Sequence, residues 1–261
     1  MNYLTKKENR VSKQFYSKGF IINKNESTKS FKYINDLILK NIKKLLNTNK
    51  KINLNHLHKF IDIKNLNELR LSLIFNINKD KNLRFHYFNC ARNSLYSLTG
   101  NELMMQKNIN LSIQFPMDET SLLPIHSDVW SGDSPYEVNA WLPLVDCYKT
   151  KSMYLLDPNE NDKLQKRMKG NKFSSSSKIY SLVKNKIKWI KIDKGNHLIF
   201  NQNLPHGNIV NKEKETRVSM NCRFKSLFSP YADKKIGEFF LPITERILTK
   251  LGNNYEFPFK S

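Results

Sequence analysis

Hydrophobic positions follow different periods in the two parts of the chain. Before about residue 108 they recur at near-helical spacing, and the clearest set is Phe31, Ile34, Leu37, Ile38 and Ile42. This spacing predicts a helix over Ser27–Leu46, and similar patterns predict helices over Leu66–Ile77 and Tyr87–Leu98. A short strand is expected over Gly19–Ile22. Residues 1–107 are therefore predicted to be mainly helical.

From about Ile109 the pattern changes to short, often alternating runs separated by turn-forming residues. These runs are NINLSIQF, VNAWLPLVD, SMYLL, IKWIKID, HLIFNQ and RVSMNCRF. Strands that follow a group of helices predict the α+β class. We expect a double-stranded β-helix, the jelly roll of cupin-like proteins, over residues 108–228, with the N-terminal helices packed outside it. Residues 229–261 form a C-terminal extension, and 1–261 is predicted to be a single domain.

The segment Asp157–Ser177 interrupts these strands. It is rich in Lys, Asn and Ser and offers little to bury, so it is predicted to be an exposed loop. A mobile cover over the functional site is one interpretation of it.

Composition allows one sizeable core, because 39% of the 261 residues are hydrophobic. The formal net charge of +21 raises a nucleic-acid hypothesis, including a nucleic-acid demethylase. However, lysines are scattered along the whole chain among many Asn and Ile residues, which share A/T-rich codons, so genome composition is the favoured explanation. A basic surface still attracts phosphorylated or other anionic substrates.

The sequence disfavours both a membrane-spanning protein and a protein stabilised by disulfide bonds. No apolar run approaches the roughly 20 residues that span a bilayer, and the sequence MNYLTKKENR lacks the features of a secretory signal, so we expect a soluble cytoplasmic protein. The three cysteines, Cys90, Cys147 and Cys222, are widely spaced and form no CxxC pair. They are predicted to be buried, reduced thiols.

The first candidate metal ligands occur in PIHSD, where His126 and Asp128 lie two positions apart. At a strand end, side chains with this spacing project to one face. His206 in NLPHG follows the strand HLIFNQ and is suited to be a third ligand from a distant part of the chain. Two imidazoles and one carboxylate hold iron(II) on one side and leave positions open for oxygen and a bidentate co-substrate. His126, Asp128 and His206 are therefore the predicted metal ligands and catalytic residues.

The strand RVSMNCRF supplies candidates for binding the co-substrate. Its apolar residues alternate with Arg217, Ser219, Asn221 and Arg223, as expected if a polar face looks into a ligand-filled barrel. Arg217, eleven positions after His206, and Ser219 offer a cationic fork and a hydroxyl for the distal carboxylate of 2-oxoglutarate. Arg223 is the alternative cation, and Gln114 on the preceding strand LSIQF is a further candidate.

A structural role for Arg217 is the competing interpretation. In that case it would be a surface arginine paired with Glu213 or Glu215.

Possible substrate-binding residues follow the first metal motif, in WSGDSPYEVNAWLPLVD. Trp and Tyr stack on sugar rings, and Glu and Asn bind hydroxyl groups. The candidates are Trp130, Tyr136, Glu137, Asn139 and Trp141. Ordinary barrel packing is an equally good explanation for Trp141.

These motifs, HSDVWSGDSPYEVNAWLPLVD and FNQNLPHG through RVSMNCRF, resemble the sporadic carbohydrate cluster 2-oxoglutarate- and iron(II)-dependent oxygenases of bacterial surface-polysaccharide and aminoglycoside-type sugar gene clusters. The resemblance covers about Ile109–Tyr255. It implies iron(II), 2-oxoglutarate and O2 as cofactor and co-substrates, and a carbohydrate or sugar-nucleotide substrate. The chain departs from the family in having Gly195-Asn196 where Gly-Asp is usual, which affects a turn more than the chemistry. A cupin-type sugar isomerase or carbohydrate-binding module without redox chemistry remains the alternative function.

Overall fold

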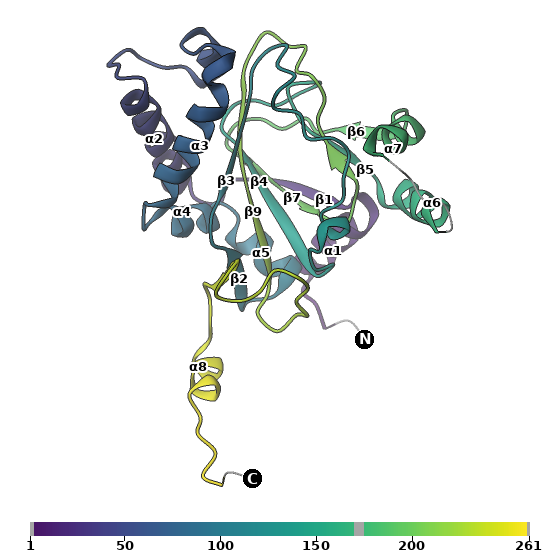
Figure 1. Ribbon diagram of the computed structural model, residues 1–261. Coiled ribbons are helices and arrows are strands. Elements are labelled where there is room, and N and C mark those ends of the chain that lie inside the picture. The colour runs from purple at the N-terminus through teal and green to yellow at the C-terminus, as the bar shows by residue number, and fades with distance from the viewer. Residues whose placement is uncertain (1–2, 170–174, 260–261) are drawn as a thin grey trace.

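Two antiparallel sheets form the centre of the computed structural model, which describes residues 3–169 and 175–259 (Figure 1). The larger sheet has the order β1-β7-β4-β9-β2-β10, and β3 also pairs with β9. Its strands are β1 (Phe20–Lys24), β2 (Leu103–Gln106), β3 (Asn110–Gln114), β4 (Glu137–Pro143), β7 (Asn196–Asn201), β9 (Arg217–Ser226) and β10 (Phe240–Pro242). The smaller sheet has the order β6-β5-β8, formed by β5 (Tyr154–Leu156), β6 (Ile187–Trp189) and β8 (His206–Gly207). The predicted α+β class with a cupin-like core is confirmed, while the single-domain assignment stays a prediction.

Strand β9 organises the larger sheet because it pairs with β2, β3 and β4. One face of β9 is apolar and fully buried, through Val218, Met220, Cys222 and Phe224. The opposite face aligns Arg217 with Gln114 of β3, and Asn221 with both Asn110 of β3 and Trp141 of β4. Since side chains alternate along a strand, the polar residues of three adjacent strands share one surface.

Helices pack against the apolar face of the larger sheet. Figure 1 shows α2 (Thr28–Leu45), α3 (Leu66–Asn78) and α4 (Leu83–Asn89) grouped on one side of it. Their buried positions, such as Ile38 of α2 and Leu73 of α3, belong to the same hydrophobic cluster as the sheet residues. The hydroxyl of Tyr87 in α4 also donates to the carbonyl oxygen of Ala140 in β4 over 2.8 Å. This packing fixes the backbone whose other face carries the site.

The helix predictions over Ser27–Leu46 and Leu66–Ile77 are confirmed by α2 and α3. The helix predicted over Tyr87–Leu98 is divided into α4 and α5 (Arg92–Thr99), because Ala91 leaves helical geometry with φ −138°. Two further helices lie near the ends of the chain. Helix α1 (Lys6–Lys18) begins with a capping box between Thr5 and Glu8, and α8 (Ile247–Asn253) extends away from the body (Figure 1). Short 3-10 helices are η1 (Leu54–Lys59), η2 (Ile63–Asn65) and η3 (Asp128–Ser131).

The prediction of an exposed loop over Asp157–Ser177 is wrong for most of that segment. Helix α6 (Pro158–Met168) occupies its first half, and α7 (Ser176–Val183) begins at its end; residues 170–174 lie outside the described part. The side chain of Asp157 caps α6 by accepting from the backbone N–H of Glu160 at 2.9 Å, and proline follows at the first helical position. Both helices bury apolar residues against the smaller sheet. Local capping and Leu164 therefore outweigh the polar composition.

The three cysteines are free and buried, as predicted. Among the described residues, no helix combines the length and apolar character needed to cross a membrane.

Candidate metal centre and adjoining cavity

His126 and His206 are brought together by a reciprocal backbone pairing. The N–H of His126 donates to the carbonyl oxygen of His206 over 3.0 Å, and the N–H of His206 donates back over 2.8 Å. His206 opens β8, while Asp128 opens η3 and donates its own N–H to the carbonyl oxygen of Gln202 at 3.2 Å. Residues from distant parts of the chain are thus held to one small region by main-chain hydrogen bonds.

The three side chains are arranged as a metal-binding group. One ligand atom from each of His126, Asp128 and His206 lies within 4.8 Å of the others. Oδ1 of Asp128 is 3.5 Å from Nε2 of His126 and 3.9 Å from Nε2 of His206. Two imidazole nitrogens and one carboxylate oxygen are a donor set that could hold a metal ion, and this set suits mononuclear iron(II) with open positions.

The ring orientation of both histidines suits metal binding. Nδ1 of His126 lies 2.9 Å from the carbonyl oxygen of Pro124, and Nδ1 of His206 lies 2.9 Å from that of Leu204. A carbonyl oxygen only accepts, so in the neutral form of each ring Nδ1 carries the proton and Nε2 keeps its lone pair for a cation. Burial also lowers the pKa of His206 to about 4, which keeps this ring neutral at physiological pH.

Arg223 holds the carboxylate of the group. Its Nη2 lies 3.1 Å from Oδ1 of Asp128 and 3.4 Å from Oδ2 of Asp133, and its Nε donates to Oε1 of Gln202 over 3.1 Å. Burial alone would favour the protonated acid, but His126, His206 and Arg223 together hold the pKa of Asp128 well below its usual value. Asp128 is therefore ionised and ready to bind a cation.

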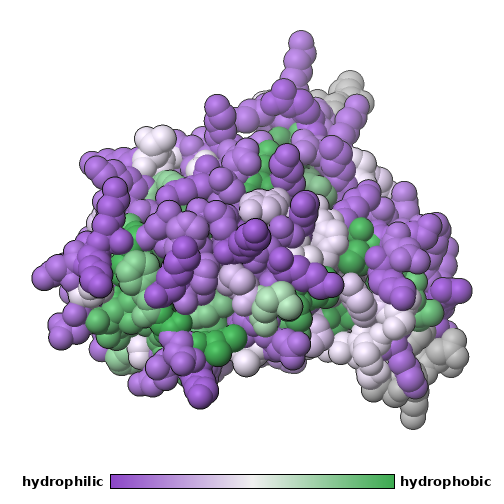
Figure 2. Space-filling view, turned by 90° about the horizontal axis from the view of Figure 1, so that it is seen from above, coloured by the Kyte–Doolittle hydropathy of each residue, from purple (hydrophilic) through white to green (hydrophobic). Residues whose placement is uncertain are grey.

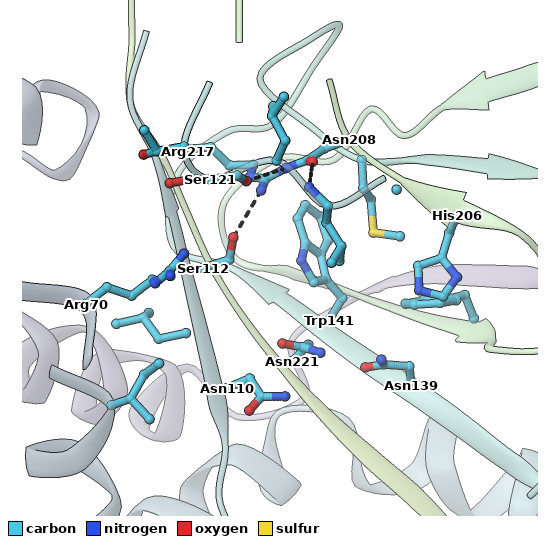
Figure 3. A pocket seen from close by; sticks show the side chains of 18 of the residues that line it. Arg70, Asn110, Ser112, Ser121, Asn139, Trp141, His206, Asn208, Arg217 and Asn221 are labelled. Atoms are coloured by element: carbon cyan, nitrogen blue, oxygen red, sulfur yellow. Dashed lines mark hydrogen bonds between the residues drawn. The ribbon is translucent and has the colours of Figure 1, made fainter. Parts of the chain in front are cut away.

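A cavity of about 460 Å³ adjoins this group and extends across the polar face of β3, β4 and β9 (Figure 3). His206, Asn139 and Trp141 line it towards the metal group, and Arg217 and Ser112 line it further along. No aspartate or glutamate is among the described residues that line it. The interior is therefore electropositive and suited to an anionic ligand.

Arg217 is buried without an acidic partner. Its side chain donates from Nη1 to the carbonyl oxygen of Ser152 at 2.8 Å and from Nη2 to Oγ of Ser112 at 3.0 Å, while Nε has no partner. The residue is only 4% exposed, and burial lowers the pKa of its guanidinium to about 10. A buried cation of this kind calls for an anion, and the cavity is where one would bind.

The alternative pairing of Arg217 with nearby acids is wrong. Glu215 accepts a 2.6 Å hydrogen bond from the buried ammonium of Lys151, and Glu213 accepts from Thr150. Neither glutamate forms an ion pair with Arg217. The two acids instead tie their loop to the segment before β5.

Ser219 and Gln114, the other predicted co-substrate residues, lie on the same surface as Arg217 but are fully buried. Ser219 has an unpartnered hydroxyl. The Gln114 side chain donates to the carbonyl oxygen of Ile209 over 2.8 Å, which gives it a structural contact. Their assignment to the co-substrate stays a prediction.

The five possible substrate residues are separated by the fold. Asn139 and Trp141 line the cavity beside the metal group. Tyr136 and Glu137 line a different hollow, and Glu137 is held by the amide of Gln202 at 2.9 Å. Trp130 lies in η3 and is 38% exposed.

Sequence reasoning missed several residues that line the cavity. Arg70 of α3, Asn110 of β3 and Asn208 after β8 are the polar ones of most interest. Period-2 alternation in NINLSIQF would have placed Asn110 on the same face as Ser112 and Gln114. Arg70 is the one Lys or Arg in the sequence of α3, and no local pattern indicates which surface it faces.

The chain matches no protein-family model, and no curated protein sequence matches it. Among solved structures, it is similar to the nickel complex of the non-heme monooxygenase ThoJ, with 13% identity, 90% of this chain and 84% of that chain covered and a TM-score of 0.50. It is also similar to HygX from Streptomyces hygroscopicus with nickel and 2-oxoglutarate bound, at 12% identity, 89% and 90% coverage and a TM-score of 0.50. AviO1 from Streptomyces viridochromogenes Tue57 gives 12% identity, 88% and 99% coverage and a TM-score of 0.55. Identities this low establish a shared fold, that of the non-haem oxygenases.

Proposed function

We propose that this protein is an iron(II)- and 2-oxoglutarate-dependent oxygenase that oxidises a carbohydrate or sugar-containing precursor. The observation that carries the proposal is Arg217, a buried guanidinium without an acidic partner, in the same cavity wall as His206 of the His-Asp-His group. A small diacid whose inner end binds the metal and whose outer carboxylate meets Arg217 neutralises both cations. 2-Oxoglutarate has that shape, and HygX shares the fold and binds it beside nickel.

The residues of this chain prepare the site before any ligand arrives. Nε2 of His126, Nε2 of His206 and a carboxylate oxygen of Asp128 would hold iron(II), because each has a free lone pair directed to the same region. Arg223 orients Asp128 and, together with His126 and His206, keeps it ionised. When bound, iron(II) and 2-oxoglutarate supply oxidation by O2, in which the co-substrate becomes succinate and carbon dioxide and the organic substrate is oxidised.

The cavity wall suits a carbohydrate next to this centre. Asn139 presents a buried amide, and Trp141 presents an aromatic ring, near His206 (Figure 3). Amide groups hydrogen-bond to hydroxyls in both directions, and aromatic faces pack on the C–H groups of sugar rings. Hydroxylation is the expected default outcome, with desaturation, epimerisation and ring closure as other outcomes of the same chemistry.

The test is spectroscopic and needs no substrate. Purified protein is incubated anaerobically with iron(II), and 2-oxoglutarate is added while the visible spectrum is recorded. A weak charge-transfer band that appears only when both are present would support the proposal. A folded protein that binds iron(II) but shows neither the band nor stabilisation by 2-oxoglutarate would instead be a jelly-roll isomerase or binding module.

A further inference from the structure

The cavity contains a second arginine that the co-substrate does not explain. Arg70 projects from α3 into its lining, one turn before Ile74. Its Nη2 donates to Oδ1 of Asn67 over 2.6 Å, and it forms no ion pair within the described part of the chain. Under the proposed function, Arg217 pairs with the outer carboxylate of 2-oxoglutarate. No anionic group is then assigned to Arg70.

Three asparagines lie along the same wall without internal partners. Asn110 of β3 is aligned with Asn221 of β9, which is aligned with Trp141 of β4, and Asn139 lies two positions before Trp141 (Figure 3). None of the three amides hydrogen-bonds to another described residue, and all three line the cavity. Asn139 is only 2% exposed, and its Oδ1 has no partner.

The buried Oδ1 of Asn139, which has no partner, indicates a polar ligand. The amides of Asn110 and Asn221 on the same wall are half-buried and extend this polar surface. A buried polar atom without a hydrogen bond is destabilising, so such atoms are rare unless a ligand or water supplies the missing hydrogen bond. A row of three amides matches a molecule with several hydroxyl groups, because each amide both donates and accepts. The cation at the α3 side adds a requirement for negative charge.

We propose that the substrate is a sugar that carries an anionic group, a phosphate or a carboxylate, which Arg70 binds while Asn110, Asn139 and Asn221 bind the hydroxyls. This inference rests on the proposed function, because it assigns Arg217 to 2-oxoglutarate. The overall charge of +21 favours the approach of such a substrate, and hydrophilic residues cover most of the face seen in Figure 2. Arg70 is thus a specificity residue rather than a part of the co-substrate site.

The experiment compares three probes on anaerobic protein loaded with iron(II) and 2-oxoglutarate. They are α-D-glucose 1-phosphate, D-glucuronate and D-glucose, and binding is measured by calorimetry and by the change in the visible band. Glucose 1-phosphate or glucuronate should bind at least about 10-fold more tightly than glucose, since a charge-assisted contact contributes roughly 1.5–3 kcal/mol. Whichever anionic sugar binds better identifies the group as phosphate or carboxylate.

Variants distinguish the role of Arg70 in substrate binding from the role of Arg217 in binding 2-oxoglutarate. Arg70→Gln should remove the preference for the anionic sugar, with the affinity for 2-oxoglutarate unchanged. Lys81→Gln, which removes an exposed cation outside the cavity, should leave both affinities as in the wild type. Asn221→Ser should weaken all three probes by a similar factor.

Three results would overturn the inference. These are equal binding of charged and neutral sugars by the wild type, no binding of any probe, and a loss of 2-oxoglutarate affinity in Arg70→Gln that equals the loss in Arg217→Gln. In each case an intact band with 2-oxoglutarate would leave the oxygenase proposal standing. Absence of that band in the wild type would count against the oxygenase itself.

Discussion

Replacing Arg217 by methionine tests two effects of this buried cation, one on the free energy of unfolding and one on the affinity for 2-oxoglutarate. In the wild type this guanidinium is 4% exposed and donates only to two neutral acceptors, the carbonyl oxygen of Ser152 and Oγ of Ser112. Removing the charge relieves a desolvation penalty of several kcal/mol. Losing the two hydrogen bonds costs about 1–3 kcal/mol each. Because these effects oppose each other, the free energy of unfolding without ligand should change by less than about 2 kcal/mol.

The effect on the co-substrate should be much larger. A bidentate contact between guanidinium and carboxylate consists of two charge-assisted hydrogen bonds of roughly 1.5–3 kcal/mol each, so its loss weakens binding about 100-fold or more. At 100 times the wild-type dissociation constant, 2-oxoglutarate adds about 2.7 kcal/mol to the stability of the wild type. At the same concentration Arg217→Met should gain only about 0.4 kcal/mol, since the ligand is then near its dissociation constant.

Urea unfolding with and without 2-oxoglutarate, performed anaerobically with iron(II), measures both quantities. Arg84→Met is the matched control, because Arg84 is another partly buried arginine that donates to backbone carbonyl oxygens, those of Met105 and Leu241, and lies outside the cavity lining. It should keep the full 2.7 kcal/mol or so of ligand stabilisation. If Arg217→Met also keeps it, the assignment of Arg217 to 2-oxoglutarate is refuted.

Three other predictions concern the candidate metal group and the fold around it. Arg223→Gln should reduce iron(II) affinity about 10–100-fold, measured by metal titration, because Asp128 loses a partner that fixes the orientation of its carboxylate. Burial lowers the pKa of His197 from 6.5 to about 4, so the unfolded state takes up the proton first and the free energy of unfolding falls as pH drops below 6.5. His197 should contribute about 2 kcal/mol of the loss between pH 7 and pH 5, so the loss measured by urea unfolding should be smaller by about that amount in His197→Gln. Gly207→Ala should destabilise the fold by roughly 1–3 kcal/mol and weaken metal binding, because its Cβ would lie 2.7 Å from the carbonyl oxygen of Leu123; unchanged thermal unfolding would contradict this.

Local periodicity was sufficient for the elements that build the scaffold. The alternation in RVSMNCRF predicted which side chains of β9 enter the core and which face the ligand side, because a strand has only two faces. The helix over Ser27–Leu46 followed from its apolar spacing in the same way. In the segment after Asp157 the polar composition indicates a loop, but the Asp-Pro helix start determines the conformation.

Other features depend on contacts between distant segments. Arg217 and Arg223 share one face of one strand, so the sequence left both open as co-substrate ligands. The structure distinguishes them through Asp133, which follows η3 and is itself paired with Lys234 from beyond β9. The position of Arg70 also depends on contacts between distant segments, because the packing of α3 against β3 determines which residues of α3 line the cavity.

The two arginines of β9 illustrate how one repeating pattern supports two different roles. Arg223 meets Asp128 and Asp133, so its charge is already balanced and it can act only by holding the carboxylate of the metal group. Arg217 donates to neutral oxygens and forms no ion pair with a described residue, so under the proposed function an anionic ligand in the cavity would supply its ion-pair partner. Under the proposed function, ligand binding would offset the free-energy cost of burying that cation, so a stability measurement with and without 2-oxoglutarate tests the role of Arg217 before any substrate is known.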